Sequence, residues 1–106
     1  SGTGHHVAMM ISAVALAVLI PLFVISVVPV IGAPHAQVVA HFGRPFPALV
    51  AALTIVVAMH HFRGGVQVMI EDYWQGMTRK LAVVAMILVS YGAAAVGLFA
   101  IARLAL

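Results

Sequence analysis

The segment from His60 to Tyr73 gathers side chains that could bind a cofactor or a substrate in a sequence that is otherwise almost entirely apolar. It reads His-His-Phe-Arg-Gly-Gly-Val-Gln-Val-Met-Ile-Glu-Asp-Tyr and contains both acidic residues of the chain, Glu71 and Asp72. Ionisable side chains are costly inside a bilayer, so those that occur there are functional candidates. This segment therefore holds the candidate functional residues of the chain.

Helical spacing places two polar positions of the segment on one face. Asp72 follows His61 by 11 positions, which at about 100° per residue returns to within about 20° of the same direction. The rise is roughly 16 Å, so His61 lies near the middle of a hydrocarbon core about 30 Å thick when Asp72 lies at the headgroups. His60 points about 100° away. Gly64 and Gly65 lie near the face of His61 and would let a flat macrocycle approach the backbone.

These residue types suggest redox chemistry. His61 is a candidate axial ligand of haem iron, because a neutral imidazole nitrogen is a common iron ligand. The second ligand would be another histidine of this chain or one of a partner. Asp72 and Tyr73 are candidates for binding a quinone headgroup, since a phenol can donate a hydrogen bond to a quinone carbonyl. Arg63 could pair with a haem propionate or with phospholipid.

Each candidate also has a purely structural interpretation. His61 could hydrogen-bond across a helix interface. The run Asp72-Tyr73-Trp74 could belong to an interfacial belt, where Tyr and Trp are enriched. Arg63 could extend its charged end toward the headgroups. The 6 methionines are expected to pack rather than to bind metal. The residues alone leave both interpretations open.

Three long apolar stretches predict an all-α integral membrane protein that carries this segment. The chain has 106 residues, of which 65% are hydrophobic and 7% charged, whereas a soluble domain has about 25% charged residues. A spanning helix needs about 20 apolar residues. We expect one domain, residues 1–106, with spans at about 7–28, 46–70 and 81–102.

Pro and Gly residues predict how the first two spans are connected. Pro21 is expected to kink the first span. The connection at residues 29–45 is rich in Pro and Gly, and Ala36 to Phe42 within it could form a short helix at the membrane interface. His35 and His41 are expected to be exposed there.

Charge and cysteine content exclude several functions. The net charge of +3 comes from scattered residues, and without a basic cluster no nucleic-acid partner is expected. The chain has no cysteine, which excludes disulfides and cysteine-ligated iron–sulfur clusters on it. Any iron–sulfur centre must therefore belong to a partner.

Three helices enclose little interior, so we expect assembly with other membrane helices. A face of small residues in the third span should pack closely against a neighbour; it comprises Ser90, Ala93, Ala94 and Gly97. Three spans place the N-terminus and the 72–80 loop on the same side. Arg79 and Lys80 favour the cytoplasm for that side by the positive-inside rule.

With His61 placed 11 positions before Asp72-Tyr73 on the second of three expected helices, the chain resembles the small hydrophobic membrane-anchor subunit of succinate dehydrogenase (respiratory complex II), of the alphaproteobacterial and mitochondrial type. The stretches Ser1 to His6 and Ser12 to Ala15 also resemble this family. The resemblance covers nearly the whole chain.

The resemblance implies a fold, cofactors and partners. Three transmembrane helices would pack with the helices of a sister anchor subunit and hold haem b between the two chains. His61 would be one axial ligand and the sister subunit would supply the other. Asp72 and Tyr73 would line the ubiquinone site, near the iron–sulfur subunit and on the cytoplasmic side of the bacterial inner membrane. Succinate oxidation would take place on the flavoprotein subunit, with no succinate chemistry on this chain.

One position departs from the family pattern. Many members have an arginine on the first helix that contacts a haem propionate, and Met10 occupies that position here. The resemblance therefore leaves the propionate contacts to His5, His6, Arg63 or the sister subunit. The alternatives to this function are a fumarate reductase anchor, and a structural or transport membrane subunit without a redox role.

Overall fold

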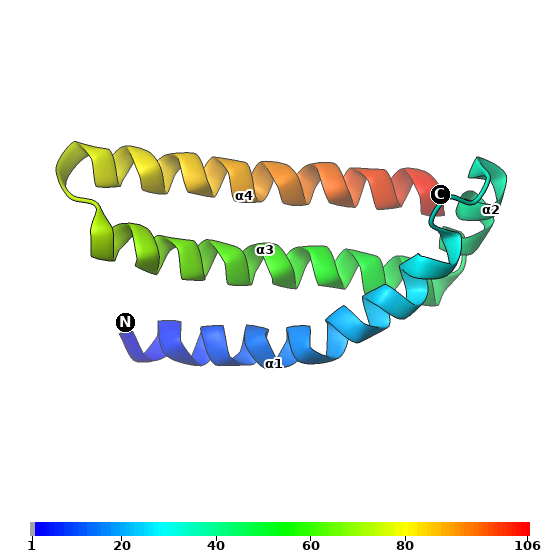
Figure 1. The fold of residues 1–106 in the computed structure, drawn as a ribbon, viewed down its shortest axis with the longest axis horizontal. Helices are drawn as coiled ribbons and strands as arrows, with labels where there is room; N and C mark the ends of the chain where they lie inside the picture. The colour runs from blue at the N-terminus through cyan, green and yellow to red at the C-terminus, as the bar shows by residue number, and fades with distance from the viewer. Residues whose placement is uncertain (1) are drawn as a thin grey trace.

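The computed structural model describes residues 2–106, which form helices joined by short connections (Figure 1). Helix α1 spans Gly2–Val27 and continues into a 3-10 turn, η1, at Val28–Val30. Helix α2 is short, at His35–Phe42, and is followed by α3 at Pro45–Tyr73 and α4 at Gly76–Ala105. Three of these helices are long and apolar enough to cross a membrane. The expected all-α membrane fold is thereby confirmed.

Helix α3 is the central element of the structure. Helices α1 and α4 each pack along α3 and not against each other, and the three together are about 50 Å long. The N-terminus lies at the same end as the α3–α4 turn, whereas α2 and the C-terminus lie at the opposite end (Figure 1). This arrangement puts the polar segment of the sequence on the helix that contacts both others.

The connection between α3 and α4 is much shorter than the expected loop at 72–80. Only Trp74 and Gln75 lie between the two helices, and Gly76 adopts φ +64° at the start of α4, a value that glycine adopts readily. Charged residues end the apolar stretch in the sequence, but they do not end the helix. The 29 residues of α3 extend about 43 Å, so its ends can project beyond a core about 30 Å thick.

Arg79 joins the two helices across this turn. Its Nη2 donates to the carbonyl oxygen of Glu71 at 2.6 Å, and its Nε donates to the carbonyl oxygen of Trp74 at 3.0 Å. Carbonyl groups in the last turn of a helix have no intrahelical partner, and a cationic side chain is favourable there. Arg79 therefore fixes the backbone on both sides of Asp72 and Tyr73.

The first connection contains the helix that the sequence predicts. Helix α1 changes direction in its second half (Figure 1), as Pro21 inside the helix predicts. His35 is exposed, as expected. The same expectation for His41 is wrong, because His41 is half-buried and its Nε2 donates to the carbonyl oxygen of Ser26 at 2.6 Å. That carbonyl lies in the last turn of α1, where it needs an external donor.

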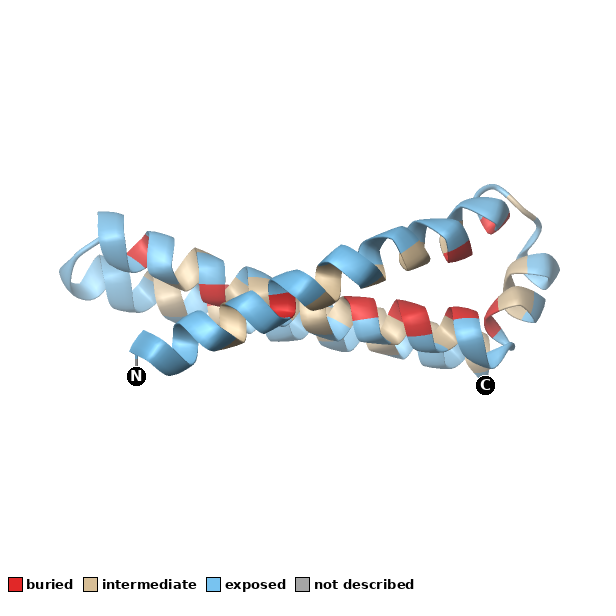
Figure 2. Ribbon diagram, turned by 90° about the horizontal axis from the view of Figure 1, so that it is seen from below, coloured by how far each residue is buried: buried red, intermediate tan, exposed pale blue. Residues whose placement is uncertain are grey.

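The buried core is small and lies toward the α2 end. Val30, Phe42 and Ala51 form its centre. Farther along α4, Ser90 is only 2% exposed, and a Cβ placed on Gly97 would lie 3.0 Å from Ile55 Cδ1. The small-residue face therefore packs on α3, although Ala93 is exposed. The outer faces of all three long helices remain exposed (Figure 2), which suits contact with lipid or with further helices.

Candidate functional site

His61 lies near the middle of α3 and faces α1. Residue 59 is the midpoint of α3, so His61 is about 3 Å along the axis from the centre of the helix. The His61 Nδ1 is 2.8 Å from the hydroxyl oxygen of Ser12 on α1. Ser12 is buried at 5% exposure, and its hydroxyl also donates to the carbonyl oxygen of Met9 at 3.0 Å. An interhelical hydrogen bond thus orients the imidazole ring within the apolar part of the bundle.

The two ring nitrogens of His61 have different surroundings. Nδ1 is engaged by Ser12, whereas Nε2 has no hydrogen-bond partner among the side chains and backbone groups of residues 2–106. The ring is half-buried, so it is not enclosed by its own chain. A neutral imidazole whose second nitrogen is hydrogen-bonded is the usual form of a metal-ligating histidine. The arrangement therefore fits a haem ligand, and the bond to Ser12 is at the same time the hydrogen bond across a helix interface that the structural interpretation of His61 predicts.

His60 and His61 are neighbours in sequence but not in environment. His60 is exposed and borders both the groove between α3 and α4 and the groove between α3 and α1. It forms no hydrogen bond to a described residue. His60 thus differs from His61 in its exposure and in its lack of a hydrogen-bond partner, although it lines the groove between α1 and α3 together with Ser12.

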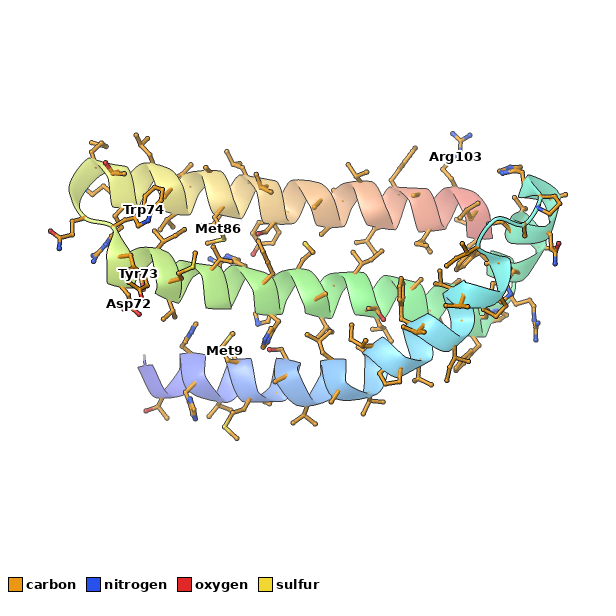
Figure 3. The ribbon with its side chains drawn as sticks, viewed as in Figure 1. Met9, Asp72, Tyr73, Trp74, Met86 and Arg103 are labelled. Atoms are coloured by element: carbon orange, nitrogen blue, oxygen red, sulfur yellow. The ribbon has the colours of Figure 1, made fainter. Side chains whose placement is uncertain are left out.

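Gly64 is buried where α3 packs against α1 and is not part of an open surface. A Cβ placed on Gly64 would lie 2.5 Å from the sulfur of Met9 and 3.5 Å from Cε1 of His5. Met9 is labelled on α1 in Figure 3, on the side that faces α3. The expectation that Gly64 lets a flat macrocycle reach the backbone is therefore wrong, because α1 occupies that space. Gly65 is exposed, although a Cβ placed on it would lie 3.7 Å from Cε of Met9.

Asp72 and Tyr73 lie in the last turn of α3, next to Trp74 at the turn into α4 (Figure 3). Asp72 is exposed, and Tyr73 is 81% exposed. Neither side chain forms a hydrogen bond within residues 2–106. Since α3 is unbroken from His61 to Asp72, the two positions are separated by roughly 16 Å along one helix. The carboxylate and the phenol are thus both free to bind an external group.

Arg63 faces α4, away from His61. Its guanidinium lies 6.0 Å from the centre of the Tyr91 ring, within the range of a cation–π contact. It borders a pocket of about 280 Å³ together with His60, and its Nε is buried without a partner in the described chain. Arg63 follows His61 by about 200° around the helix. A single group bound at His61 would therefore have to extend around α3 to reach Arg63.

The other expected propionate contacts lie on α1. His5 is on the side that faces Gly64, with its Cε1 near that glycine. His6 and Met10 are exposed, and Met10, at the position of the family's arginine, is 54% exposed. Contacts of His5, His6 or Arg63 with a propionate stay predictions.

Two residues that organise the site, Ser12 and Arg79, have no role in it among the predictions from the sequence. Ser12 is hydrogen-bonded to Nδ1 of His61. The sequence feature that could have indicated this is a hydroxyl in the middle of an apolar helix, since such groups often form hydrogen bonds across helix interfaces. Arg79 fixes the turn beside Asp72 and Tyr73. Its position near the start of α4 gave no indication that it reaches back to the end of α3.

Together, the fold and the site define a membrane protein of three long helices, with a histidine in its interior and a polar pair at one end. The family of succinate dehydrogenase/fumarate reductase transmembrane subunits matches residues 1–99. The chain is 50% identical over 105 residues to the succinate dehydrogenase hydrophobic membrane anchor subunit of Paracoccus denitrificans, an alignment that covers 99% of this chain and 81% of that protein. No solved structure matches it.

The chain therefore belongs to the family of succinate dehydrogenase/fumarate reductase transmembrane subunits. The resemblance to the small membrane-anchor subunit of succinate dehydrogenase is thereby confirmed.

Proposed function

We propose that the chain is the membrane anchor of a succinate:ubiquinone oxidoreductase, in which it holds haem b and forms part of the site where ubiquinone is reduced. Electrons would come from an iron–sulfur subunit, and succinate would be oxidised on a flavoprotein subunit. The single observation that carries the proposal is the pairing, on one unbroken helix, of His61 with a free Nε2 and the exposed Asp72 and Tyr73.

His61 would supply one axial ligand to haem b, and the sister anchor subunit would supply the other. The half-buried ring and the Nδ1 hydrogen bond support this role, because ligating histidines are commonly oriented through their second nitrogen. A bound haem would supply a one-electron carrier in the bilayer interior. The chain itself contributes the ring orientation, set between α1 and α3, and an apolar environment that excludes water.

Asp72 and Tyr73 would bind the headgroup of ubiquinone at the end of α3. Reduction places negative charge on the quinone oxygens, and a phenol that donates a hydrogen bond there stabilises that charge. The Asp72 carboxylate is a hydrogen-bond acceptor that can hold a proton close to the reduced oxygen. Arg79 would keep both residues in place through its bonds to the carbonyls of Glu71 and Trp74.

The proposal is tested on the complex purified through this chain. We expect a flavoprotein, an iron–sulfur protein and a second anchor subunit to co-purify, and the reduced complex to show a b-type haem spectrum. His61→Ala should abolish or strongly change that spectrum, because it removes an iron ligand. His60→Ala is the matched control, since His60 is exposed and forms no hydrogen bond to a described residue, and it should leave the spectrum unchanged.

Two results would contradict the proposal. A b-type spectrum that survives His61→Ala would remove His61 as the ligand. Purification without a flavoprotein would favour a structural or transport subunit instead. Both directions of the reaction would be measured in the same preparation. A fumarate reductase would reduce fumarate with quinol faster than it reduces quinone with succinate. The name of the Paracoccus relative supports the succinate dehydrogenase direction.

A further inference from the structure

We infer that Ser12 of α1 is a positioning residue for His61, which it holds in the tautomer whose Nε2 can bind iron. The inference rests on the proposed haem-binding function and adds to it a residue from another helix. Two distances carry the argument. The Ser12 Oγ lies 2.8 Å from His61 Nδ1 and 3.0 Å from the carbonyl oxygen of Met9.

The single proton of the Ser12 hydroxyl determines the direction of both hydrogen bonds. The Met9 carbonyl oxygen can only accept, so the hydroxyl donates to it. A lone pair of the Ser12 oxygen then faces Nδ1 of His61. Both short contacts are hydrogen bonds only when Nδ1 carries the imidazole proton. The neutral ring in this form has its lone pair on Nε2, the nitrogen without a partner in the described chain.

The surroundings of Ser12 favour this arrangement. A serine inside a helix readily donates to the carbonyl one turn earlier, so the local bond to Met9 directs the hydroxyl proton away from His61. Ser12 is only 5% exposed and lies near the middle of α1, so little water can compete with either partner. Bonds that form such a chain polarise one another. The bond from Nδ1 to Ser12 therefore makes Nε2 of His61 a stronger electron donor.

Loss of the Ser12 hydroxyl should thus be measurable at the haem. Without the acceptor for Nδ1, His61 can adopt either tautomer and rotate, so the haem should be held less tightly. The loss of such a partner typically costs about 10- to 100-fold in metal affinity. A weaker imidazole donor also stabilises ferric iron less, which raises the midpoint potential of the haem.

The test compares Ser12→Ala with Ser12→Thr in the purified complex. We would measure haem loss to excess apomyoglobin, the midpoint potential by optical titration, and the low-spin ferric signals by electron paramagnetic resonance. Ser12→Ala should lose haem at least about 10-fold faster, with a raised potential and shifted signals. Ser12→Thr retains the hydroxyl and should restore all three. Ser90→Ala is the matched control, because Ser90 is buried on α4 and its hydroxyl donates to the Met86 sulfur, at 3.7 Å, rather than to a histidine.

The possible failures are distinguishable. A Ser12→Ala complex with unchanged potential and spectra would overturn the role of Ser12 while leaving His61 as the ligand. Equal changes in Ser12→Ala and Ser12→Thr would assign the effect to packing and would also overturn it. A parent complex without haem, or one whose haem survives His61→Ala, would overturn the proposed function and this inference with it.

Discussion

At the scale of single residues, position on a helix separates side chains that are adjacent in the sequence. His61 is held by Ser12 inside the bundle, whereas His60 is exposed in a groove and Arg63 contacts Tyr91 on the far side of α3. About 100° of rotation per residue is enough to direct His61 and Arg63 toward different helices. The functional assignment of His61 thus depends on one short contact with another helix.

The proposed quinone site can be tested by removing one oxygen atom. Tyr73→Phe should lower succinate-dependent ubiquinone reduction about 10- to 100-fold, since a hydrogen bond to a charged oxygen contributes about 1.5–3 kcal/mol. Succinate oxidation by an artificial dye that takes electrons before the membrane should be unaffected. Both rates would be measured on the same purified preparation.

The second tyrosine provides the control for this experiment. Tyr91 is also exposed but lies on α4, where its ring contacts Arg63, and Tyr91→Phe keeps that ring. Tyr91→Phe should therefore leave ubiquinone reduction intact. Unchanged ubiquinone kinetics in Tyr73→Phe would remove Tyr73 from the site.

At the scale of helices, the sequence predicts which helices form better than it predicts where each helix begins and ends. The three long apolar helices and the short helix after Pro34 are all present. They are predictable because a run of apolar residues and the position of a proline are properties of the local sequence. The predicted end of the second span at residue 70 and the predicted start of the third at residue 81 are farther apart than the end of α3 at Tyr73 and the start of α4 at Gly76. The reason is that Glu71 and Asp72 interrupt the apolar pattern, although a helix continues through charged residues once it reaches the headgroups. The sequence allows a hydrogen bond from His61 across a helix interface, but the partners of Ser12, His41 and Arg79 could not be predicted, since each depends on which helices pack together.

The close approach of α1 to α3 at Gly64 has a consequence that can be measured. Gly64→Ala places a Cβ 2.5 Å from the Met9 sulfur, so the Met9 side chain must repack between α1 and α3, one turn from the Ser12–His61 bond. We expect faster haem loss and a lower thermal midpoint of the complex. The double substitution Gly64→Ala/Met9→Ala should reverse part of the effect, because it removes the side chain that collides.

Gly92→Ala is the control for this substitution. Gly92 lies within α4, and nothing lies within 4 Å of a Cβ placed on it. Replacing a helical glycine by alanine there should be neutral or slightly stabilising. Equal behaviour of Gly64→Ala and Gly92→Ala would show that the contact at Gly64 does not determine how α1 packs.

At the scale of the whole molecule, this chain has too little interior to hold a cofactor alone. Its core is centred on Val30, Phe42 and Ala51 at the α2 end, whereas His61 lies near the middle of α3 and is only half-buried. Large apolar side chains are exposed along all three long helices. Lipid covers such faces readily, but the free Nε2 of His61 requires a polar or metal partner. A haem shared with a second anchor subunit would provide the partner for Nε2, and the helices of that subunit would cover part of the exposed apolar faces.

The arrangement of the helices also determines which ends share one side of the membrane. The N-terminus lies at the end of the Trp74–Gln75 turn, and α2 lies at the other end (Figure 1). Arg79 and Lys80 lie next to that turn, which predicts a cytoplasmic position for it. The chain lacks cysteine, so single substitutions at exposed Gln37 and Gln75 provide unique thiols on it.

Labelling these thiols with a membrane-impermeant maleimide tests the predicted orientation. Gln37→Cys on α2 should react in intact spheroplasts, because it faces the periplasm in this orientation. Gln75→Cys should react only in inside-out vesicles, and the unsubstituted chain, identified by its mass, should not react in either. The opposite pattern would reverse the orientation and move Asp72 and Tyr73 to the periplasmic side. Since electrons from a cytoplasmic iron–sulfur subunit could not then reach a quinone at Tyr73 directly, that result would contradict the proposed quinone site as well.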